Sequence, residues 1–261
     1  MCLLLFAWQT GSSFPLIVAA NRDERLDRPA RSFCTLRDQH PRVLGGHDDL
    51  AGGTWLAANE HGVVAGLTNR PSPGGRDPNK RTRGELPLVL VGGRTASDGV
   101  EALVRRIRPD DYNPAWLLVG DRRSLFYLEV APGRPVSVQP LAPGVHVLEN
   151  APLGEPSPKV ERVRSLLAAS DGVESPWTTL PEILADHMVP VAEVHEAASD
   201  GGGVSRRLET FAACVHTDGY GTRSATLLAV PPATAGETRM LVADGPPCTA
   251  PFVDVTGCWT R

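Results

Sequence analysis

The residue with the clearest chemical potential is Cys2, directly after the initiator methionine. Removal of Met1, which a small second side chain permits, would make Cys2 the first residue. Its α-amine, with an ordinary pKa of about 7.7 to 8.0, could then take the proton of its own thiol, so no histidine base would be needed. The alternative is a small buried residue that opens a strand, which is a common setting for cysteine.

A carboxylate is predicted to reach this amine. Short β-prone apolar runs at 2–8 and 16–20 predict two antiparallel strands joined by a loop. The second strand returns to the end where the first begins, which brings Asn21, Arg22 and Asp23 there. Asp23 could orient the amine, and Arg22 or Asn21 could hold a substrate oxygen. The alternative is an ordinary polar turn whose side chains bond to the local backbone.

The order of predicted elements indicates the fold class. Strands, helices, strands, helices and strands follow one another without the strict alternation of a parallel doubly wound sheet. Two antiparallel sheets packed together and covered by helices would satisfy this order. The predicted strands are 2–8, 16–20, 54–58, 63–68, 115–120, 124–130, 136–141, 145–148, 211–216, 224–230 and 238–243, and the predicted helices are 85–91, 98–107 (capped by Ser97), 159–169 and 180–187.

Composition excludes several classes of protein. The chain has 261 residues, of which 41% are apolar and 21% charged, and its net charge is −4. These values argue against disorder and against a basic nucleic-acid binder, so we expect no nucleic-acid partner. The length allows one large domain or two small ones. No apolar run is long enough to span a bilayer, and no basic residue precedes the first one. We therefore expect a cytoplasmic protein without stable membrane insertion.

Cysteine and histidine patterns argue against metal sites. The five cysteines are odd in number and show no CxxC spacing, which favours reduced thiols. The seven histidines show no HExxH motif. We therefore expect no metal-ligand cluster and no cofactor.

Several linked motifs carry a family resemblance. They are Met1-Cys2, Ala19-Ala20-Asn21-Arg22-Asp23-Glu24, Gly52-Gly53-Thr54-Trp55-Leu56, Leu67-Thr68-Asn69, Arg83-Gly84-Glu85-Leu86 and Tyr220-Gly221-Thr222-Arg223-Ser224. From residue 2 to about residue 230 the chain resembles the NRDE family, also called the transport and Golgi organisation protein 2 family. More distantly, it is similar to the choloylglycine hydrolase and penicillin V acylase group of N-terminal nucleophile hydrolases. This resemblance implies a single α+β domain over residues 1–261, folded as a four-layer αββα sandwich of two antiparallel sheets flanked by helices.

The resemblance also implies roles for single residues. Cys2 resembles the nucleophile of those acylases, and Asp23 resembles the partner of its amine. The segment with Thr68 and Asn69 resembles the one whose backbone N–H lines the oxyanion hole, and either residue could hold that place. Asn150 resembles the asparagine whose side chain completes the hole.

Three arginines, Arg22, Arg70 and Arg223, are further candidates for the site. Arg223 resembles a late arginine near the nucleophile. The acylases carry an arginine where this chain has Ala20, and Arg22 is a possible replacement. Arg70 belongs to a loop at 69–84 that also contains the basic residues Arg76, Lys80, Arg81 and Arg83. This loop could attract an anionic substrate, such as a carboxylate, a phosphate or a haem propionate; the alternative is a solvated surface loop.

Two functions follow from these observations. The first is an N-terminal cysteine amidohydrolase or acyltransferase that acts on a small non-peptide amide through a thioester. The second is a carrier or chaperone of haem or acyl-lipid on the same fold, which eukaryotic relatives of the family suggest. A small-molecule substrate, anionic or acyl-bearing, is the expected partner of the enzyme, and haem that of the carrier.

Overall fold

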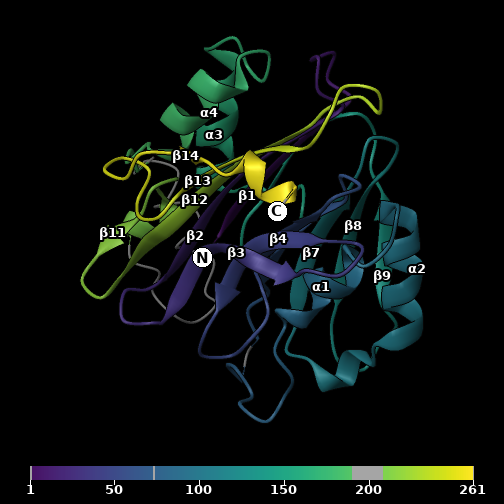
Figure 1. Ribbon diagram of the computed structural model, residues 1–261. Coiled ribbons are helices and arrows are strands. Elements are labelled where there is room, and N and C mark those ends of the chain that lie inside the picture. The colour runs from purple at the N-terminus through teal and green to yellow at the C-terminus, as the bar shows by residue number, and fades with distance from the viewer. Residues whose placement is uncertain (1, 73, 190–207, 261) are drawn as a thin grey trace.

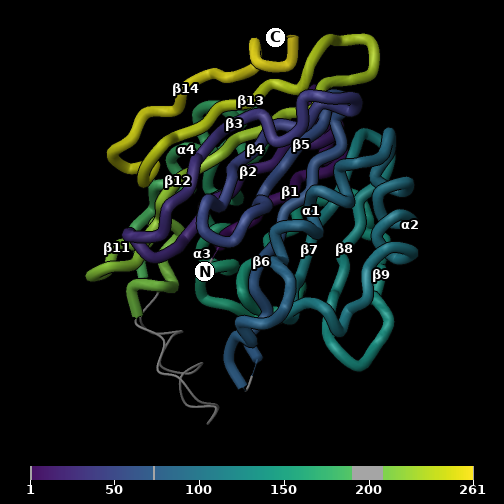
Figure 2. The backbone as a smooth tube through the Cα atoms, turned by 60° about the horizontal axis from the view of Figure 1, so that its bottom comes forward, coloured from purple at the N-terminus to yellow at the C-terminus, as the bar shows by residue number. Residues whose placement is uncertain are grey.

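The computed structural model describes residues 2–72, 74–189 and 208–260 (Figure 1). Its strands form two antiparallel seven-stranded sheets. The first sheet has the order β10-β1-β2-β12-β13-β14, with β11 paired to β12, and the second has the order β3-β4-β5-β6-β7-β8-β9. The two sheets lie face to face, with β12–β14 and β7–β9 on opposite sides of the molecule in both views (Figures 1 and 2).

The strands of the first sheet are β1 (Leu3–Trp8), β2 (Leu16–Arg25), β10 (Gly144–Leu148), β11 (His216–Thr217), β12 (Tyr220–Val230), β13 (Arg239–Ala243) and β14 (Val253–Asp254). Those of the second are β3 (Ala30–Arg37), β4 (Val43–Asp48), β5 (Leu56–Asn59), β6 (Val64–Asn69), β7 (Ala115–Gly120), β8 (Leu125–Val130) and β9 (Ser137–Pro140). The α-helices are α1 (Glu85–Leu90), α2 (Ala96–Arg106), α3 (Pro158–Ala168) and α4 (Pro176–Leu184), and the 3₁₀ turns are η1 (Pro109–Asp111), η2 (Leu208–Phe211) and η3 (Thr256–Trp259).

The fold has four layers separated by three hydrophobic cores, and the side chains of β1 enter two of these cores. Leu4 and Phe6 belong to the core between the two sheets. Leu3 and Leu5 point to the other face of the first sheet, where they pack in a core with α3 and α4. A third core joins the second sheet to α1 and α2. Because both faces of the sheets are covered, their strands are apolar on both sides, and the predicted αββα sandwich is confirmed.

The structure corrects several predicted boundaries. Strands β3 and β4 were missed because their sequences mix charged and small residues without clean alternation. The predicted strand at 211–216 is wrong: Ala212 closes a 3₁₀ turn onto Glu209, and only the last residue enters β11. Helix α2 begins earlier than expected, since Thr95 rather than Ser97 forms the capping box. Among the described residues, no helix is both long and apolar enough to cross a bilayer.

Candidate active site

The start of β1 places Cys2 between two neighbouring strands. Leu3 pairs with Asn21 of β2, and Leu4 pairs with Leu148 of β10. One step before β1, Cys2 therefore lies beside Arg22 and Asp23 on one side and Asn150 on the other. Its backbone nitrogen donates a hydrogen bond to Asn150 Oδ1 at 3.1 Å.

The Cys2 thiol is held in its protonated form. Burial raises the pKa of this thiol above its ordinary value, and the negative charge of Asp23 acts in the same direction. A hydrogen bond from the Asp23 backbone and the charge of Arg22 oppose the rise only in part. A nucleophilic thiolate at this position therefore needs a local base, and none of the histidines that the structure describes lines the surrounding cavity.

Asp23 is buried and held through both its side chain and its backbone. Asp23 Oδ1 accepts a hydrogen bond from Thr222 Oγ1 at 2.6 Å, and Tyr220 Oη donates to the Asp23 carbonyl at 3.0 Å. The antiparallel register of β12 with β2, in which Thr222 faces Asp23, brings these groups together. The pairing of β1 with β2 places Asp23 near Cys2, and the bonds to β12 fix its orientation.

Lys159 is a site residue that the sequence analysis placed only in a helix. It lies in the first turn of α3, and its Nζ is 3.3 Å from Asp23 Oδ2. Both side chains are fully shielded from solvent, at 0% exposure. A lysine is almost never fully buried unless it is paired. The Lys159 ammonium and the Asp23 carboxylate therefore each compensate for the cost of burying the other charge.

Two asparagines meet at Cys2. Asn150 Nδ2 donates to the Asn69 carbonyl at 2.5 Å, while its Oδ1 accepts from the Cys2 nitrogen. Asn69 ends β6 and is exposed to the cavity, whereas its neighbour Thr68 is fully buried. Of the two residues considered for the backbone oxyanion donor, Asn69 is therefore the one at the cavity.

A cavity of about 350 Å³ opens at Cys2. Loop residues 76, 81–84 and the turn at 51–54 form part of its wall. Gly53 and Gly84 bring these segments into contact: a side-chain Cβ on Gly53, whose φ is +79°, would lie 2.4 Å from the Gly84 carbonyl carbon. Thr54 N donates to the Gly84 carbonyl at 3.0 Å. The basic loop is thus part of the site rather than a detached surface loop.

Two of the cavity arginines are neutralised by acids. The Arg22 guanidinium stacks on Trp55, 4.3 Å from the ring centroid, and lies 3.6 Å from Asp48 and 3.9 Å from Glu24. Arg28 forms an ion pair with Asp48 at 2.8 Å. These contacts hold Arg22 at the position that the sequence analysis considered as a replacement for the arginine absent at Ala20.

Two further arginines leave an excess of positive charge. Across the described parts of the chain, no carboxylate forms an ion pair with Arg76 or Arg83, although Arg81 is paired with Glu85 at 2.5 Å. Burial lowers the pKa of Arg83 to about 10, and the charge of Arg76 adds to this effect. Arg83 is still protonated at neutral pH, so the cavity suits an anionic ligand.

Five residues considered for the site do not line this cavity, although one of them, Asn150, contacts Cys2 directly. Asn21 is buried under α4, where its Nδ2 donates to the carbonyls of Leu184 and Ala213, each at 2.8 Å. Arg70 pairs with Glu129 at 2.9 Å.

The other two residues, Arg223 and Thr68, have structural roles. Arg223 Nη1 donates to the carbonyls of Arg25, Leu26 and Arg28 at 3.0, 2.6 and 3.1 Å, which fixes the turn after β2. Thr68 belongs to the interior of β6. The structure thus brings together Cys2, Asp23, Asn69 and Asn150 beside Arg22, and leaves Asn21, Thr68, Arg70 and Arg223 outside.

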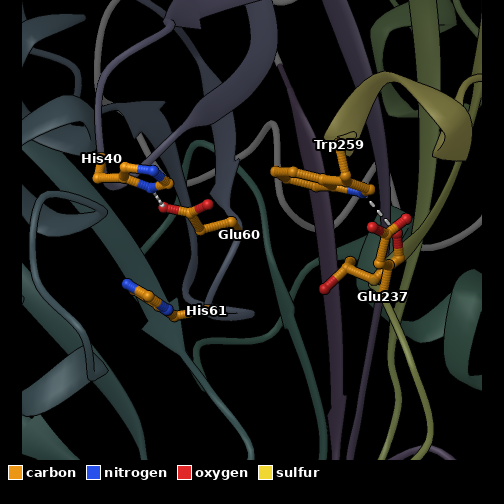
Figure 3. Close-up of a pocket in the computed structure, with 6 residues that line it drawn as sticks. His40, Glu60, His61, Glu237 and Trp259 are labelled. Atoms are coloured by element: carbon orange, nitrogen blue, oxygen red, sulfur yellow. Dashed lines mark hydrogen bonds and ion pairs between the residues drawn. The ribbon is translucent and has the colours of Figure 1, made fainter. Parts of the chain in front are cut away.

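A second hollow, of about 330 Å³, lies at the opposite end of the strands (Figure 3). Glu60 and His61 belong to the turn before β6, while Asn69 ends that strand. His40 Nδ1 lies 2.7 Å from Glu60 Oε1, the contact drawn between these two side chains in Figure 3. Trp259 Nε1 donates to the Thr238 carbonyl at 2.7 Å. Thr238 supplies a hydroxyl to this hollow, but its Oγ1 has no hydrogen-bond partner among the described residues, so no base activates it. We therefore place the chemistry at Cys2.

The prediction that metal-ligand residues do not cluster is wrong. His187, Cys214, His216 and Cys248 present their ligand atoms within 4.8 Å of one another. The sequence did not reveal this group because its members are far apart in the chain, apart from Cys214 and His216. The cluster lies outside the cavity at Cys2.

Comparison with known proteins identifies the family of this chain. Residues 1–238 match the family model described as Transport and Golgi organisation 2. The chain is similar to the Transport and Golgi organization protein 2 homologs of Bos taurus (31% identical over 252 residues, 88% of each chain) and Homo sapiens (30% over 251 residues, 88% of each chain).

Two solved structures show the same fold at low sequence identity. The Caenorhabditis elegans ortholog of N-acylethanolamine-hydrolyzing acid amidase has a TM-score of 0.55 and 14% identity, covering 91% of this chain and 98% of its own. A mutant conjugated bile acid hydrolase from Clostridium perfringens has a TM-score of 0.51 and 12% identity, covering 98% and 93%. The chain therefore belongs to the Transport and Golgi organisation 2 family, also called the NRDE family, and its fold is that of the N-terminal nucleophile hydrolases.

Proposed function

We propose that this protein is an N-terminal cysteine hydrolase, or an acyltransferase of the same chemistry, that cleaves a small non-peptide amide bearing an anionic group. One observation carries the proposal. Cys2, Asp23 and Asn69 line one arginine-rich cavity, and the Asn150 side chain bonds to both the Cys2 nitrogen and the Asn69 carbonyl. The names of both solved neighbours describe hydrolases, and one is an amidase, which supports the proposed class of reaction.

The reaction would begin after removal of Met1, when the Cys2 nitrogen becomes a free amine. This amine accepts the thiol proton, and Sγ forms a bond to the substrate carbonyl carbon. The Asn69 backbone and the Asn150 side-chain amide stabilise the oxyanion. The protonated amine then gives its proton to the leaving nitrogen as the C–N bond breaks, which leaves a thioester. Water, or another acceptor, loses a proton to the amine and displaces the thiol.

Asp23 would orient the amine through this cycle. Its two carboxylate oxygens are already held by Thr222 and Lys159, so its position does not depend on substrate. A carboxylate fixed in this way favours the protonated amine electrostatically, because opposite charges attract strongly in a buried site. Asp23 is therefore proposed as the group that positions and stabilises the ammonium.

The substrate class follows from the cavity. A volume of about 350 Å³ is near the small end of ligand pockets, which span roughly 300 to 1,000 Å³. The excess positive charge of Arg76 and Arg83 favours a carboxylate or phosphate group on the substrate.

The test combines intact mass with turnover. We expect the purified protein to be lighter than its gene product by one methionine residue, and iodoacetamide to label Cys2 faster than Cys34 or Cys214. A panel of amides that differ only in carrying a carboxylate or a neutral ester should release amine from the anionic members. Retention of Met1 would contradict the proposal, because the α-amine would then belong to another residue.

Arg83 provides a prediction on substrate binding. Loss of its charge in Arg83→Gln should raise KM for the anionic amide by roughly 10- to 100-fold, the value of a charge-assisted hydrogen bond. Arg83→Lys should recover part of the loss, and Arg94→Gln, an exposed arginine outside the cavity, should behave as the native protein.

The pH dependence of KM offers a further check on Arg83. Because the pKa of Arg83 is about 10, binding should be fully present at neutral pH and weaken as the pH rises through 10. An unchanged KM in Arg83→Gln would exclude the proposed role of this side chain.

The carrier alternative remains a hypothesis with less support. Cavity arginines would suit haem propionates, but no histidine lines the cavity and Cys2 is its single sulfur side chain within the described residues. Haem titration followed by the Soret band separates the two functions, since a carrier would bind haem stoichiometrically and release no amine from the amide panel.

A further inference from the structure

Four potential metal ligands come together at one edge of the first sheet. Cys214 and His216 lie just before and within β11, His187 follows α4, and Cys248 lies in the loop between β13 and β14. In Figure 1, β11 and the loop that precedes β14 lie on the same side of the molecule. Residues from three separate segments of the chain thus meet at one point.

The distances match those between the ligands of tetrahedral zinc. With Zn–S bonds of about 2.3 Å and Zn–N bonds of about 2.0 to 2.1 Å, two sulfurs lie about 3.8 Å apart and a sulfur and a nitrogen about 3.5 Å apart. In this structure Cys214 Sγ is 3.8 Å from Cys248 Sγ. His216 Nε2 is 3.5 Å from Cys214 Sγ and 3.4 Å from Cys248 Sγ. Three ligand atoms therefore already form one face of the expected tetrahedron.

His187 is positioned to supply the fourth ligand. Its Nδ1 lies 3.2 Å from the Cys214 carbonyl, and its ring centroid is 4.9 Å from that of His216. Zinc-bound histidines usually donate their second ring N–H to such a carbonyl, which fixes the tautomer and leaves the other nitrogen for the metal. The Cys214 carbonyl can thus orient His187 toward the sulfurs.

A disulfide between Cys214 and Cys248 explains the positions of these four side chains less well. An S–S bond of about 2.05 Å would require the two sulfurs to move together by well over 1 Å. It would also give no role to His216, which lies equally close to both sulfurs.

We propose that His187, Cys214, His216 and Cys248 bind one structural zinc ion. Two thiolates and two imidazoles in a tetrahedron are typical of zinc, and four protein ligands leave no open position for catalysis. Binding releases the protons of the two thiols and forms four metal–ligand bonds, with no change of oxidation state.

The zinc site would stabilise a segment that contacts the candidate active site. Cys214 N donates to the Asp186 carbonyl at 2.9 Å, and Val215 N donates to Thr222 Oγ1 at 2.8 Å. Thr222 Oγ1 in turn donates to the Asp23 carboxylate at 2.6 Å. The ion would therefore hold in place the chain that orients Asp23, without touching substrate.

Metal analysis of untagged protein tests the proposal independently of any activity. We expect one zinc per chain by elemental mass spectrometry, and loss of that zinc in Cys248→Ser and His187→Gln. These two positions are not fully buried, so the variants should fold, and Cys34→Ser, outside the cluster, should keep its zinc. Cobalt added to metal-free protein should give a thiolate-to-cobalt charge-transfer band that Cys248→Ser lacks.

Stability provides the second readout. Removing zinc with a chelator should lower Tm by about 10 °C, the shift expected for a domain of this size when a ligand at about a thousand times its Kd is removed, and zinc should restore it. A native protein with no bound metal and no response to zinc would overturn the proposal. So would a Cys214–Cys248 disulfide found by non-reducing peptide mapping.

Discussion

The Cys2→Ala variant is expected to lose turnover of any amide that the native protein hydrolyses, by about 10³-fold or more in kcat, because the nucleophile is removed. Alanine is also a small second residue, so Met1 should still be cleaved and the α-amine, Asp23 and Asn150 should keep their places. Substrate binding by the arginines should persist, so an affinity measurement should change little. Steady-state kinetics and isothermal titration on the same preparation measure the two effects.

The control for this variant is Cys34→Ala, which removes a thiol outside the cavity and should leave kcat unchanged. Mass spectrometry adds a direct readout: the native protein mixed with substrate should carry an acyl group on Cys2, and Cys2→Ala should carry none. Native-like turnover in Cys2→Ala would mean that the reaction proceeds through another group.

The Lys159→Met variant is expected to lower the free energy of unfolding by roughly 3 to 5 kcal/mol, because it leaves the buried Asp23 carboxylate without its cation. The double variant Lys159→Met with Asp23→Asn should regain much of that stability, since no buried charge is then left unpaired. The double variant should not regain turnover of the amide substrate, because an uncharged side chain at position 23 cannot stabilise the Cys2 ammonium. Urea denaturation measures the first effect and kinetics the second.

Arg164→Gln on the same helix is the matched control. Its partner Glu161 lies 3.1 Å away, but both side chains are about half exposed, so their ion pair should contribute less than about 1 kcal/mol. If Lys159→Met proved as harmless as Arg164→Gln, the buried pair would not hold Asp23 in place.

Local features of the fold could be read from the sequence. The continuous apolar run from Leu3 to Trp8 and the second run after it predicted that Asp23 lies near Cys2, because an antiparallel pairing returns to the end from which it began. The family motifs implied the αββα layers and the pair of asparagines at Cys2. The N-cap of α2 was predicted two residues too late, at Ser97 instead of Thr95, because serine and threonine are both favourable N-cap residues.

The tertiary structure alone determined which distant groups meet. Lys159 contacts Asp23 across 136 residues, and Cys248 contacts Cys214 across 34. It also showed that Arg83 faces the cavity whereas Arg223 binds the turn after β2. Hydrophobic periodicity specifies which face of a strand or helix is buried, but not which helix covers which sheet or at what register. Contacts between charged, sulfur and imidazole groups depend on that packing, so they emerge only when the layers are assembled.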